Sequence, residues 1–226
     1  MYAWLQPVVS IFSPMLTLCF WLVQDWGLAI VLFTLIVRFF LSPLNLKIAR
    51  QQILQQRIRP KMLELQERYK SDPQQLAQAM VKLYQQHGIK PLMTFAAVFL
   101  QAPIFMGMYA LFLSQGAAMS SILIPWVSTF AQPDAWHILP ALSISFTYLV
   151  HLLPLTGDLL PALPLGQRAG TGLLMVPVLL LFLWKAPVAT ALYWVAGSIF
   201  ALLERVFYRT AWGRRVLSRG LMEAAE

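Results

Sequence analysis

The feature that most constrains this chain is an apolar run, residues 26–46, which reads WGLAIVLFTLIVRFFLSPLNL and holds one charged residue, Arg38. An α-helix rises about 1.5 Å per residue, so about 20 apolar residues cross the hydrocarbon core of a bilayer. The whole chain has a matching composition, with 59% hydrophobic and 12% charged residues. Soluble domains have about 45–50% and about 25%. The sequence therefore predicts an all-α integral membrane protein.

Five apolar runs divide the chain. We expect transmembrane helices at residues 26–46, 91–113, 136–155, 171–184 and 187–207, of which the fourth is short. The expected regions are an outer N-terminal segment with the first span (1–46), a cytoplasmic two-helix hairpin (47–90), spans two to five (91–207) and a basic cytoplasmic tail (208–226). Residues 114–135 are apolar but interrupted by Gly and Pro, so we expect them in the outer interface and not in a sixth span.

The basic residues give the orientation. Of the seventeen Lys and Arg residues, nine lie between Lys47 and Lys90 and five between Arg205 and Arg219. Loops rich in Lys and Arg stay in the cytoplasm, so the hairpin, the connection around Arg168 and the C-terminus should face inward and the N-terminus outward. A nucleic-acid-binding protein would spread these charges over a folded surface, so we expect no specific DNA binding.

The polar insert between spans one and two has the pattern of a helical hairpin. Its first arm carries an apolar stripe at helical spacing, and its second arm repeats the stripe. Asp72 is expected to cap the second arm, with Pro73 at its first helical position, and His87-Gly88 to end it. The stripe residues are Leu54, Ile58, Met62, Leu65 and Tyr69 in the first arm, and Leu76, Met80 and Leu83 in the second.

Arg38 lies about 18 Å and about 13 Å from the two ends of the first span, and an arginine at a helix centre costs about 2.5–3.5 kcal/mol on insertion scales. The acidic residues nearest the spans, Asp25, Asp134 and Glu204, lie at span ends. We therefore favour a water-filled recess around Arg38 over an internal ion pair. Pro43 either kinks the helix beside it or marks the cytoplasmic end of the helix.

Other polar and aromatic groups at membrane depth are candidates to line the same recess. They are Thr34, Gln101, Ser145, Thr147, Tyr193 and Trp194. The alternative for each is an ordinary packing contact, because Ser and Thr often bond across membrane helices. The basic tail, RVFYRTAWGRRVLSRG, either contacts anionic lipid or binds RNA phosphates. The residues expected to make these ribosome or lipid contacts are Arg209, Arg214, Arg215 and Arg219.

Four phrases resemble the YidC/Oxa/Alb family of membrane protein insertases, in the same order and spacing. They are WGLAIVLFTLIVRFFLSPLNLK, KMLELQERYKSDPQQLAQAMVKLYQQHGIKPL, LQAPIFMGMYALF and APVATALYW. The resemblance covers residues 26–204 and implies the form without a large periplasmic domain. The chain departs from the family pattern at the end of the last span, where Leu203-Glu204-Arg205 replaces a glutamine-rich stretch, and in the Pro- and Leu-rich link before the fourth span.

The resemblance implies a multi-pass protein of the bacterial inner membrane that acts as an insertase and chaperone. Such a protein moves short polar segments of clients through a hydrophilic groove open to cytoplasm and lipid. Nascent membrane proteins are then the partners, with the ribosome, the Sec translocon and anionic lipids as further candidates. The resemblance also favours Gln101 and Trp194 as groove-lining residues. A short fourth span would let the bilayer thin locally.

Two other functions are weaker. A small-solute or ion transporter would also use an intramembrane arginine, but it usually carries an inverted repeat, which the sequence does not show. An enzyme needs a nucleophile and a base together at membrane depth, and none is predicted. The sequence contains no GxxxxGK[ST] motif for ATP. Its one cysteine, Cys19, and its three separated histidines predict no disulfide, metal or cofactor.

Overall fold

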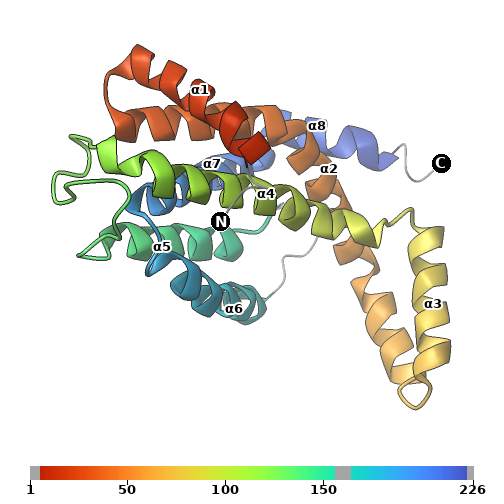
Figure 1. Cartoon of the computed structure of the whole chain (residues 1–226). Coiled ribbons are helices and arrows are strands. Elements are labelled where there is room, and N and C mark those ends of the chain that lie inside the picture. Colours follow the sequence, from red (N-terminus) through yellow and green to blue (C-terminus); the bar gives the residue numbers. More distant parts are fainter. Residues whose placement is uncertain (1–5, 156–163, 223–226) are drawn as a thin grey trace. The chain divides into compact units, whose positions relative to one another are not determined.

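In a computed structural model, residues 6–155 and 164–222 are described, apart from the side chains of residues 94–98, 100 and 220–222. This part of the chain is helical (Figure 1), which confirms the all-α prediction for it. The elements, in order, are α1 (Gln6–Val23), α2 (Trp26–Arg68), α3 (Pro73–Gln86), α4 (Pro91–Gln115), the 3₁₀ helix η2 (Gly116–Ala118), α5 (Ile138–Leu152), α6 (Leu165–Leu183), α7 (Val188–Arg209) and α8 (Ala211–Met222).

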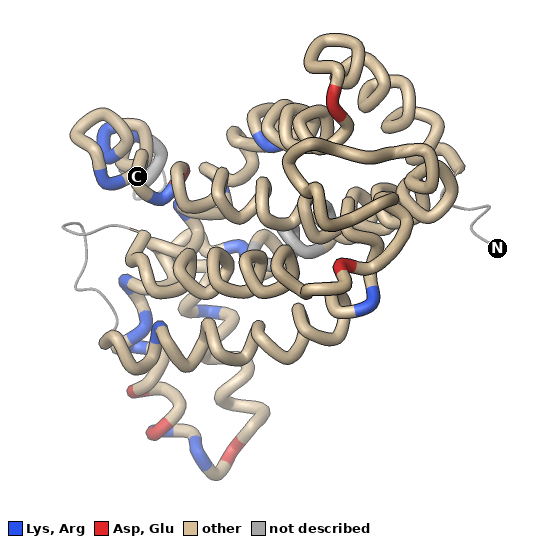
Figure 2. The backbone as a smooth tube through the Cα atoms, turned by 90° about the vertical axis from the view of Figure 1, so that its left-hand side faces the viewer, with Lys and Arg blue, Asp and Glu red and all other residues tan. Residues whose placement is uncertain are grey.

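Several of these helices suit a membrane. Among the described residues, α1, α2, α6 and α7 are long and apolar enough to cross one, and α5 is apolar but shorter, with 15 residues. Figure 2 shows long stretches of backbone that carry no charged residue. The helices are therefore those expected of an integral membrane protein.

The chain forms two compact units. The first comprises Met1–Leu41, Leu100–Pro154 and Leu163–Arg205, and the second comprises Ser42–Phe99, Leu155–Ala162 and Val206–Glu226. Helices α2, α4 and α7 contribute residues to both units.

The core of the first unit is built around α7. Val188, Ala189 and Ala191 of this helix are at most 1% exposed, as are Phe33 of α2 and Phe112 of α4. Small residues on one helix let its neighbours approach closely, which is how membrane helices gain packing energy. Helices α5 and α6 also pack on each other in this unit. Polar groups on α7 are thereby held between several helices.

Helix α1 folds back along the start of α2 (Figure 1). The rings of Phe12 and Phe33 meet edge to face at 5.4 Å, and Phe20 stacks on Trp26 at 4.2 Å. On α4, a Cβ added to Gly107 would lie 2.3 Å from the Val8 side chain, so the missing side chain makes room for α1. From the sequence, this region was expected to be an outer segment, and no helix was predicted in it.

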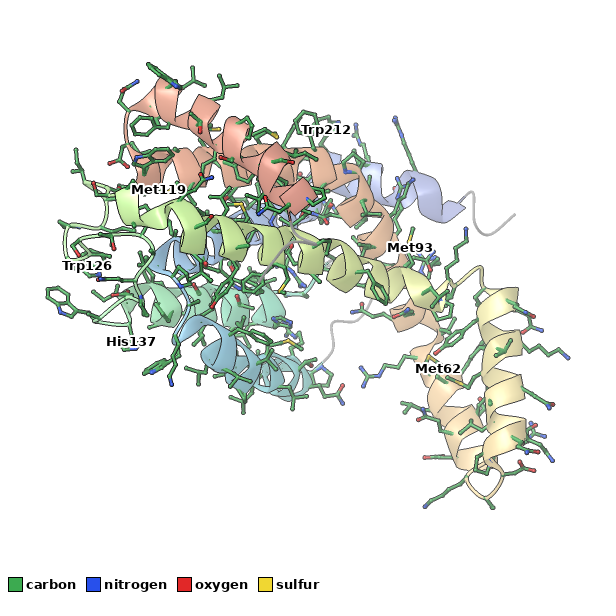
Figure 3. All side chains as sticks on the ribbon, viewed as in Figure 1. Met62, Met93, Met119, Trp126, His137 and Trp212 are labelled. Carbon is green, nitrogen blue, oxygen red and sulfur yellow. The ribbon has the colours of Figure 1, made fainter. Side chains whose placement is uncertain are left out.

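The segment between α4 and α5 is non-helical after η2, so it forms no sixth spanning helix, as expected. Its core contacts are made by Met119, Ile124, Val127 and Phe130, which are at most 8% exposed. The buried Asp134 carboxylate accepts hydrogen bonds from Trp126 Nε1 (3.0 Å) and the Leu139 amide (2.8 Å), which ties the segment to the start of α5. Figure 3 labels Met119, Trp126 and His137 along this segment.

The Asp25 carboxylate ties the same segment to α2. It accepts hydrogen bonds from Ser121 Oγ (2.6 Å), the Ile122 amide (2.8 Å) and the Leu28 amide in the first turn of α2 (2.9 Å). Partial desolvation would raise the pKa of Asp25, but these bonds and one from the Gly27 amide outweigh it, so the pKa lies below its ordinary value. Asp25 thus holds the start of α2 in place.

The predicted lengths of the third and fourth spans are corrected by the structure. Helix α6 begins at Leu165, six residues before the predicted start, so it has 19 residues and is not short, and Arg168 lies within it. Gly166, Gly170 and Gly172 obscured this start, although Gln167, Arg168 and Ala169 are good helix formers. The short apolar helix is α5.

In the second unit, the end of α2 and α3 lie side by side (Figure 1). Ile58 and Leu83 are buried in one cluster, with Met62 and Leu65 packed against it, so residues of both predicted stripes meet there. Asp72 caps α3 by accepting from the Gln74 and Gln75 amides, Pro73 starts the helix and His87 ends it, all as predicted. Gly88 follows with a φ of 61°, which favours glycine.

Helix α2 runs without a break from the first predicted span into the first arm of the hairpin. Pro43 and Pro60 both lie inside it, so the alternative that Pro43 ends the helix is wrong. A proline removes one helical hydrogen bond, and here the strong helix formers around it, such as Leu44, Leu46 and Lys47, are enough to continue the helix.

Candidate functional site

Arg38 projects from the fourth turn of α2, and its side chain is half-exposed. Within residues 6–155 and 164–222, it makes no ion pair and no side-chain hydrogen bond. Charged side chains in membrane helices usually pair with one another or with backbone carbonyls, or they face a water-filled cavity.

Gly197 of α7 determines where the Arg38 guanidinium lies. A Cβ built on Gly197 would lie 2.7 Å from Arg38 Nη2, 3.2 Å from Nε and 3.3 Å from Cζ. Contacts below 3.0 Å are essentially never made by real Cβ atoms, so any side chain here would push the guanidinium away from its place against the α7 backbone. The sequence analysis missed Gly197, although it lies one turn after Tyr193 on the same helix face.

Tyr193 joins Gln101 beside this arginine. The Tyr193 side chain is 1% exposed, and Gln101 Nε2 donates to its hydroxyl at 2.9 Å. The charge of Arg38 is within electrostatic range of Tyr193. Two of the predicted residues, from α4 and α7, therefore converge near Arg38.

A second group of polar contacts lies next to the first on α7. Trp194 Nε1 donates to Thr147 Oγ1 at 3.2 Å, and Thr147 shares a hydrogen bond of 3.0 Å with Ser198. The Trp194 ring also meets Phe105 edge to face at 5.5 Å. This group joins α4, α5 and α7, and the sequence analysis missed Ser198 and Phe105 in it. Ser198 follows Trp194 by one helical turn, which is the signal that could have found it.

The two remaining predicted residues do not belong to either group. Thr34 is fully buried, and its hydroxyl donates to the Ile30 carbonyl one turn earlier at 2.6 Å. Ser145 is exposed, and its hydroxyl donates to the Ala141 carbonyl at 2.8 Å. Both bonds are local to one helix, which is the usual way a membrane helix satisfies Ser and Thr.

Two arginines fix the C-terminal end of α5. Arg168 Nη1 of α6 donates to the Leu152 carbonyl, and Arg205 Nη1 of α7 donates to the Leu153 carbonyl. Cations near the last carbonyls of a helix compensate its dipole. Arg168 and Arg205 therefore hold α5, α6 and α7 together at one end.

The basic residues predicted to contact a ribosome or lipid differ in exposure. Arg209, Arg215 and Arg219 are exposed, whereas Arg214 is half-buried and has an interaction of its own. Among the residues that the structure describes, no group of three or more His, Cys, Asp or Glu side chains is placed to hold a metal ion.

The chain is similar to known proteins of one family. The profile of a family described as 60Kd inner membrane protein matches residues 19–214. Membrane protein insertase YidC of Wolinella succinogenes is 32% identical over 202 residues, covering 86% of this chain and 36% of that protein. Membrane protein insertase YidC 2 of Bacillus anthracis is 34% identical over 188 residues, covering 80% of this chain and 71% of that protein.

A solved structure is also similar. It is described as an active YidC insertase crystal structure with the first transmembrane domain resolved, and it matches with a TM-score of 0.67 and 25% identity over 89% of this chain and 46% of that one. The chain spans little more than a third of the Wolinella protein and of a YidC from Histophilus somni, 36% and 38% of their lengths. These relatives are named as insertases and not as enzymes. The chain belongs to the 60Kd inner membrane protein family, the YidC/Oxa/Alb insertases.

Proposed function

We propose that this protein is a membrane protein insertase that moves short polar segments of its clients across the bilayer without ATP. The observation that carries the proposal is Arg38, a half-exposed charge in an apolar helix that has no carboxylate partner among the described residues. Two relatives that are 32% and 34% identical over 86% and 80% of this chain bear the insertase name.

We propose five spans, formed by the first part of α2 and by α4, α5, α6 and α7. The rest of α2 and α3 then form a cytoplasmic hairpin, with the N-terminus outside and the C-terminus inside. The nine basic residues between Lys47 and Lys90 support this orientation. The family description as an inner membrane protein supports the membrane.

Helix α1 is proposed to lie against the outer end of α4 and not to add a sixth span. Ser13 contacts Gln115, the last residue of α4, and Val8 packs at Gly107. Gly107 is eight residues before Gln115, or about 12 Å along α4. Val8 and Ser13 are five residues apart, or about 7.5 Å along α1, so this part of α1 follows the outer end of α4.

The proposed mechanism depends on the charge of Arg38. A client that enters the bilayer must bring a polar and often acidic tail through hydrocarbon. Water around Arg38 shortens the apolar distance, and the guanidinium attracts the acidic groups more strongly at the low dielectric of the membrane than in water. The apolar helix of the client then moves into lipid because its own transfer is favourable.

Local thinning of the bilayer is now assigned to α5 and no longer to the fourth span. Helix α5 has 15 residues and is therefore about 22 Å long, against about 30 Å for the hydrocarbon core. A short helix draws the bilayer thinner around it. This would lower the barrier beside Thr147 and Trp194.

The proposed partners are nascent membrane proteins and anionic lipids, with the ribosome and the Sec translocon as further candidates. The +8 net charge and the basic segments outside the apolar helices support contacts with anionic surfaces.

Reconstitution tests the proposal. Pure protein in liposomes should insert a small membrane protein from solution, with no nucleotide present, as measured by protease protection of the translocated tail. Liposomes without the protein, and liposomes with the protein after heating, are the controls. Solute or ion movement without client insertion would favour the transporter alternative and overturn the proposal.

A further inference from the structure

The junction between α7 and α8 is a rigid elbow. Thr210 is the one residue between the two helices. Its hydroxyl donates to the Phe207 carbonyl at 2.8 Å and accepts from the Gly213 amide at 3.1 Å, which makes it the cap of α8. The Phe207 and Trp212 rings meet edge to face across the junction at 5.5 Å.

Gly213 makes this elbow possible. A Cβ at this position would lie 2.0 Å from the Phe207 carbonyl oxygen and 2.9 Å from Tyr208 Cα. Both are backbone atoms, which cannot move aside as a flexible side chain can. The first turn of α8 therefore packs directly on the last turn of α7, and the direction in which α8 leaves is fixed.

One face of α8 is anchored in the second unit. Leu217 is fully buried in a cluster with Ile53, Ile58 and Tyr208. Arg50 Nη2 of α2 donates to the Val216 carbonyl at 2.8 Å. The tail is thus a docked helix, with one face covered.

The opposite face of α8 carries a stripe that no described residue covers. Trp212 is 68% exposed, and Arg215 and Arg219 are exposed as well. At 3.6 residues per turn these three positions fall within an arc of about 60°. Figure 3 shows Trp212 on this helix. Arg209, exposed at the end of α7, adds a basic side chain beside the elbow.

We infer that the stripe of Trp212, Arg215 and Arg219 is a docking surface for the head groups of anionic phospholipids. The indole ring favours the boundary between head groups and acyl chains, and arginines bind phosphates and anionic surfaces. The occupant follows from the chain itself, because α7 is long and apolar enough to cross a membrane and α8 begins two residues after it ends. The inference rests on the proposed placement of α7 as a span.

The rigid junction between α7 and α8 gives lipid binding a structural consequence. Because Gly213 and Leu217 fix α8 from the other side, lipid bound to the stripe is bound to the same unit as α3 and the end of α2. Lipid binding to α8 thereby ties the second unit to the membrane surface. A flexible tail with the same charges would not transmit this constraint.

The experiment uses a nitroxide spin label on the full chain in nanodiscs. The variant Cys19→Ser/Trp212→Cys carries the label, and the nanodiscs contain either phosphatidylcholine alone or a mixture with phosphatidylglycerol. We expect the label to collide more with lipid-soluble oxygen and less with a water-soluble nickel chelate in the anionic nanodiscs. A label at Val81, exposed on α3, is the water-facing reference and should show no change.

Two further variants test the charges and the elbow. Arg215→Gln/Arg219→Gln should abolish the difference between the two lipid mixtures, and Gly213→Ala should reduce it. Gly170→Ala is the matched control, because a Cβ there meets nothing within 4 Å. A label that stays as exposed to nickel as the Val81 reference in anionic nanodiscs would overturn the inference. So would a label shielded only when ribosomes are added.

The outcome is separable from the proposed function. If substitution of Arg38 leaves client insertion unchanged, the insertase mechanism is contradicted, but the result for the label at residue 212 is unaffected. A water-exposed label with normal client insertion would contradict only the docking surface.

Discussion

Arg38 and Gly197 act as a pair at the scale of single residues. The guanidinium lies against the α7 backbone because Gly197 has no side chain, with Arg38 Nη2 at 2.7 Å from the place of a Cβ. The backbone of α7 thus supports the charge without neutralising it. An acidic residue in the same place would stabilise the fold but would remove the net attraction for an acidic client.

Gly197→Ala tests this pair. The methyl group must displace the guanidinium, which can move because it is the far end of a flexible side chain. We expect the fold to persist while insertion of a client with an acidic tail falls about threefold to tenfold, or about 0.7–1.4 kcal/mol. Insertion is measured in liposomes by protease protection of the translocated tail.

Gly166→Ala serves as the control for this substitution, because a Cβ at that glycine meets nothing within 4 Å. It should insert the acidic client at the wild-type rate. Equal losses in both alanine variants, or an unchanged rate for Gly197→Ala, would mean that the guanidinium position is unimportant.

At the scale of residues, the sequence predicted which polar side chains belong to the candidate site better than it predicted the residues they contact. Arg38, Gln101, Tyr193, Thr147 and Trp194 were selected because polar groups are costly at membrane depth, and the structure places them in two neighbouring groups of contacts. Thr34 and Ser145 were selected on the same ground but bond within their own helices. Which hydroxyl bonds across helices depends on helix rotation, which sequence spacing does not give.

At the scale of elements, the Asp25 carboxylate links the start of α2 to the segment that follows η2. Its carboxylate caps the first turn of α2 and binds residues 121 and 122 of the segment after η2. Its pKa lies below the ordinary value of about 3.9 because these hydrogen bonds outweigh partial desolvation. The stabilisation is therefore complete above the unfolded-state pKa and is lost as the pH falls through the folded-state pKa.

Thermal unfolding in detergent between pH 7 and pH 3 measures this effect. The wild type should lose stability in the acid part of the range, and Asp25→Asn should be less stable at pH 7 and depend less on pH. Asp25→Asn with the pH dependence of the wild type would show that another group is responsible.

Asp72 provides a second test of an element, the start of α3. Its side chain accepts from the Gln74 and Gln75 amides at 3.1 and 3.0 Å. Asp72→Ala should cost about 1 kcal/mol of local stability, seen as faster hydrogen exchange in the first turns of α3. Asp72→Ser keeps an oxygen cap and should retain most of the protection. Equal exchange in both variants would contradict the cap's contribution.

The elements were predictable where periodicity or a capping signal marked them. The stripe residues, Asp72 and His87 gave α3 and its contact with α2, because spacing and capping act locally. The continuity of α2 through Pro43 was not predictable, since a proline is tolerated or not according to the residues around it. Helix α1 was missed because the apolar segment before Trp26 showed no clear start or stop.

For the molecule as a whole, the two compact units predict separable roles. The buried cores of the units share no residue, since one cluster centres on Phe33 and Tyr193 and the other on Ile53 and Leu217. Deleting residues 58–83 removes the end of α2 and all but the last three residues of α3, which lie outside the first core. We expect the first unit to stay folded, with its thermal transition retained, while client insertion is impaired. We propose that the hairpin receives clients, and normal insertion by this deletion would contradict that proposal.

The central claim is that Arg38 acts on the client as a charge. The most direct measurement compares insertion of two matched clients, with and without acidic residues in the translocated tail, by wild type and by Arg38→Lys, Arg38→Ala and Arg38→Glu at equal levels of folded protein. Lys keeps the charge but loses the planar fork of the guanidinium, so Arg38→Lys should insert both clients nearly as well as wild type.

Arg38→Ala should impair the acidic client most, and Arg38→Glu should be worst for it because like charges repel strongly at low dielectric. The neutral client should lose much less in every variant. Equal losses for both clients in all three variants would contradict the account, because they would mean that Arg38 maintains the fold and does not attract the client.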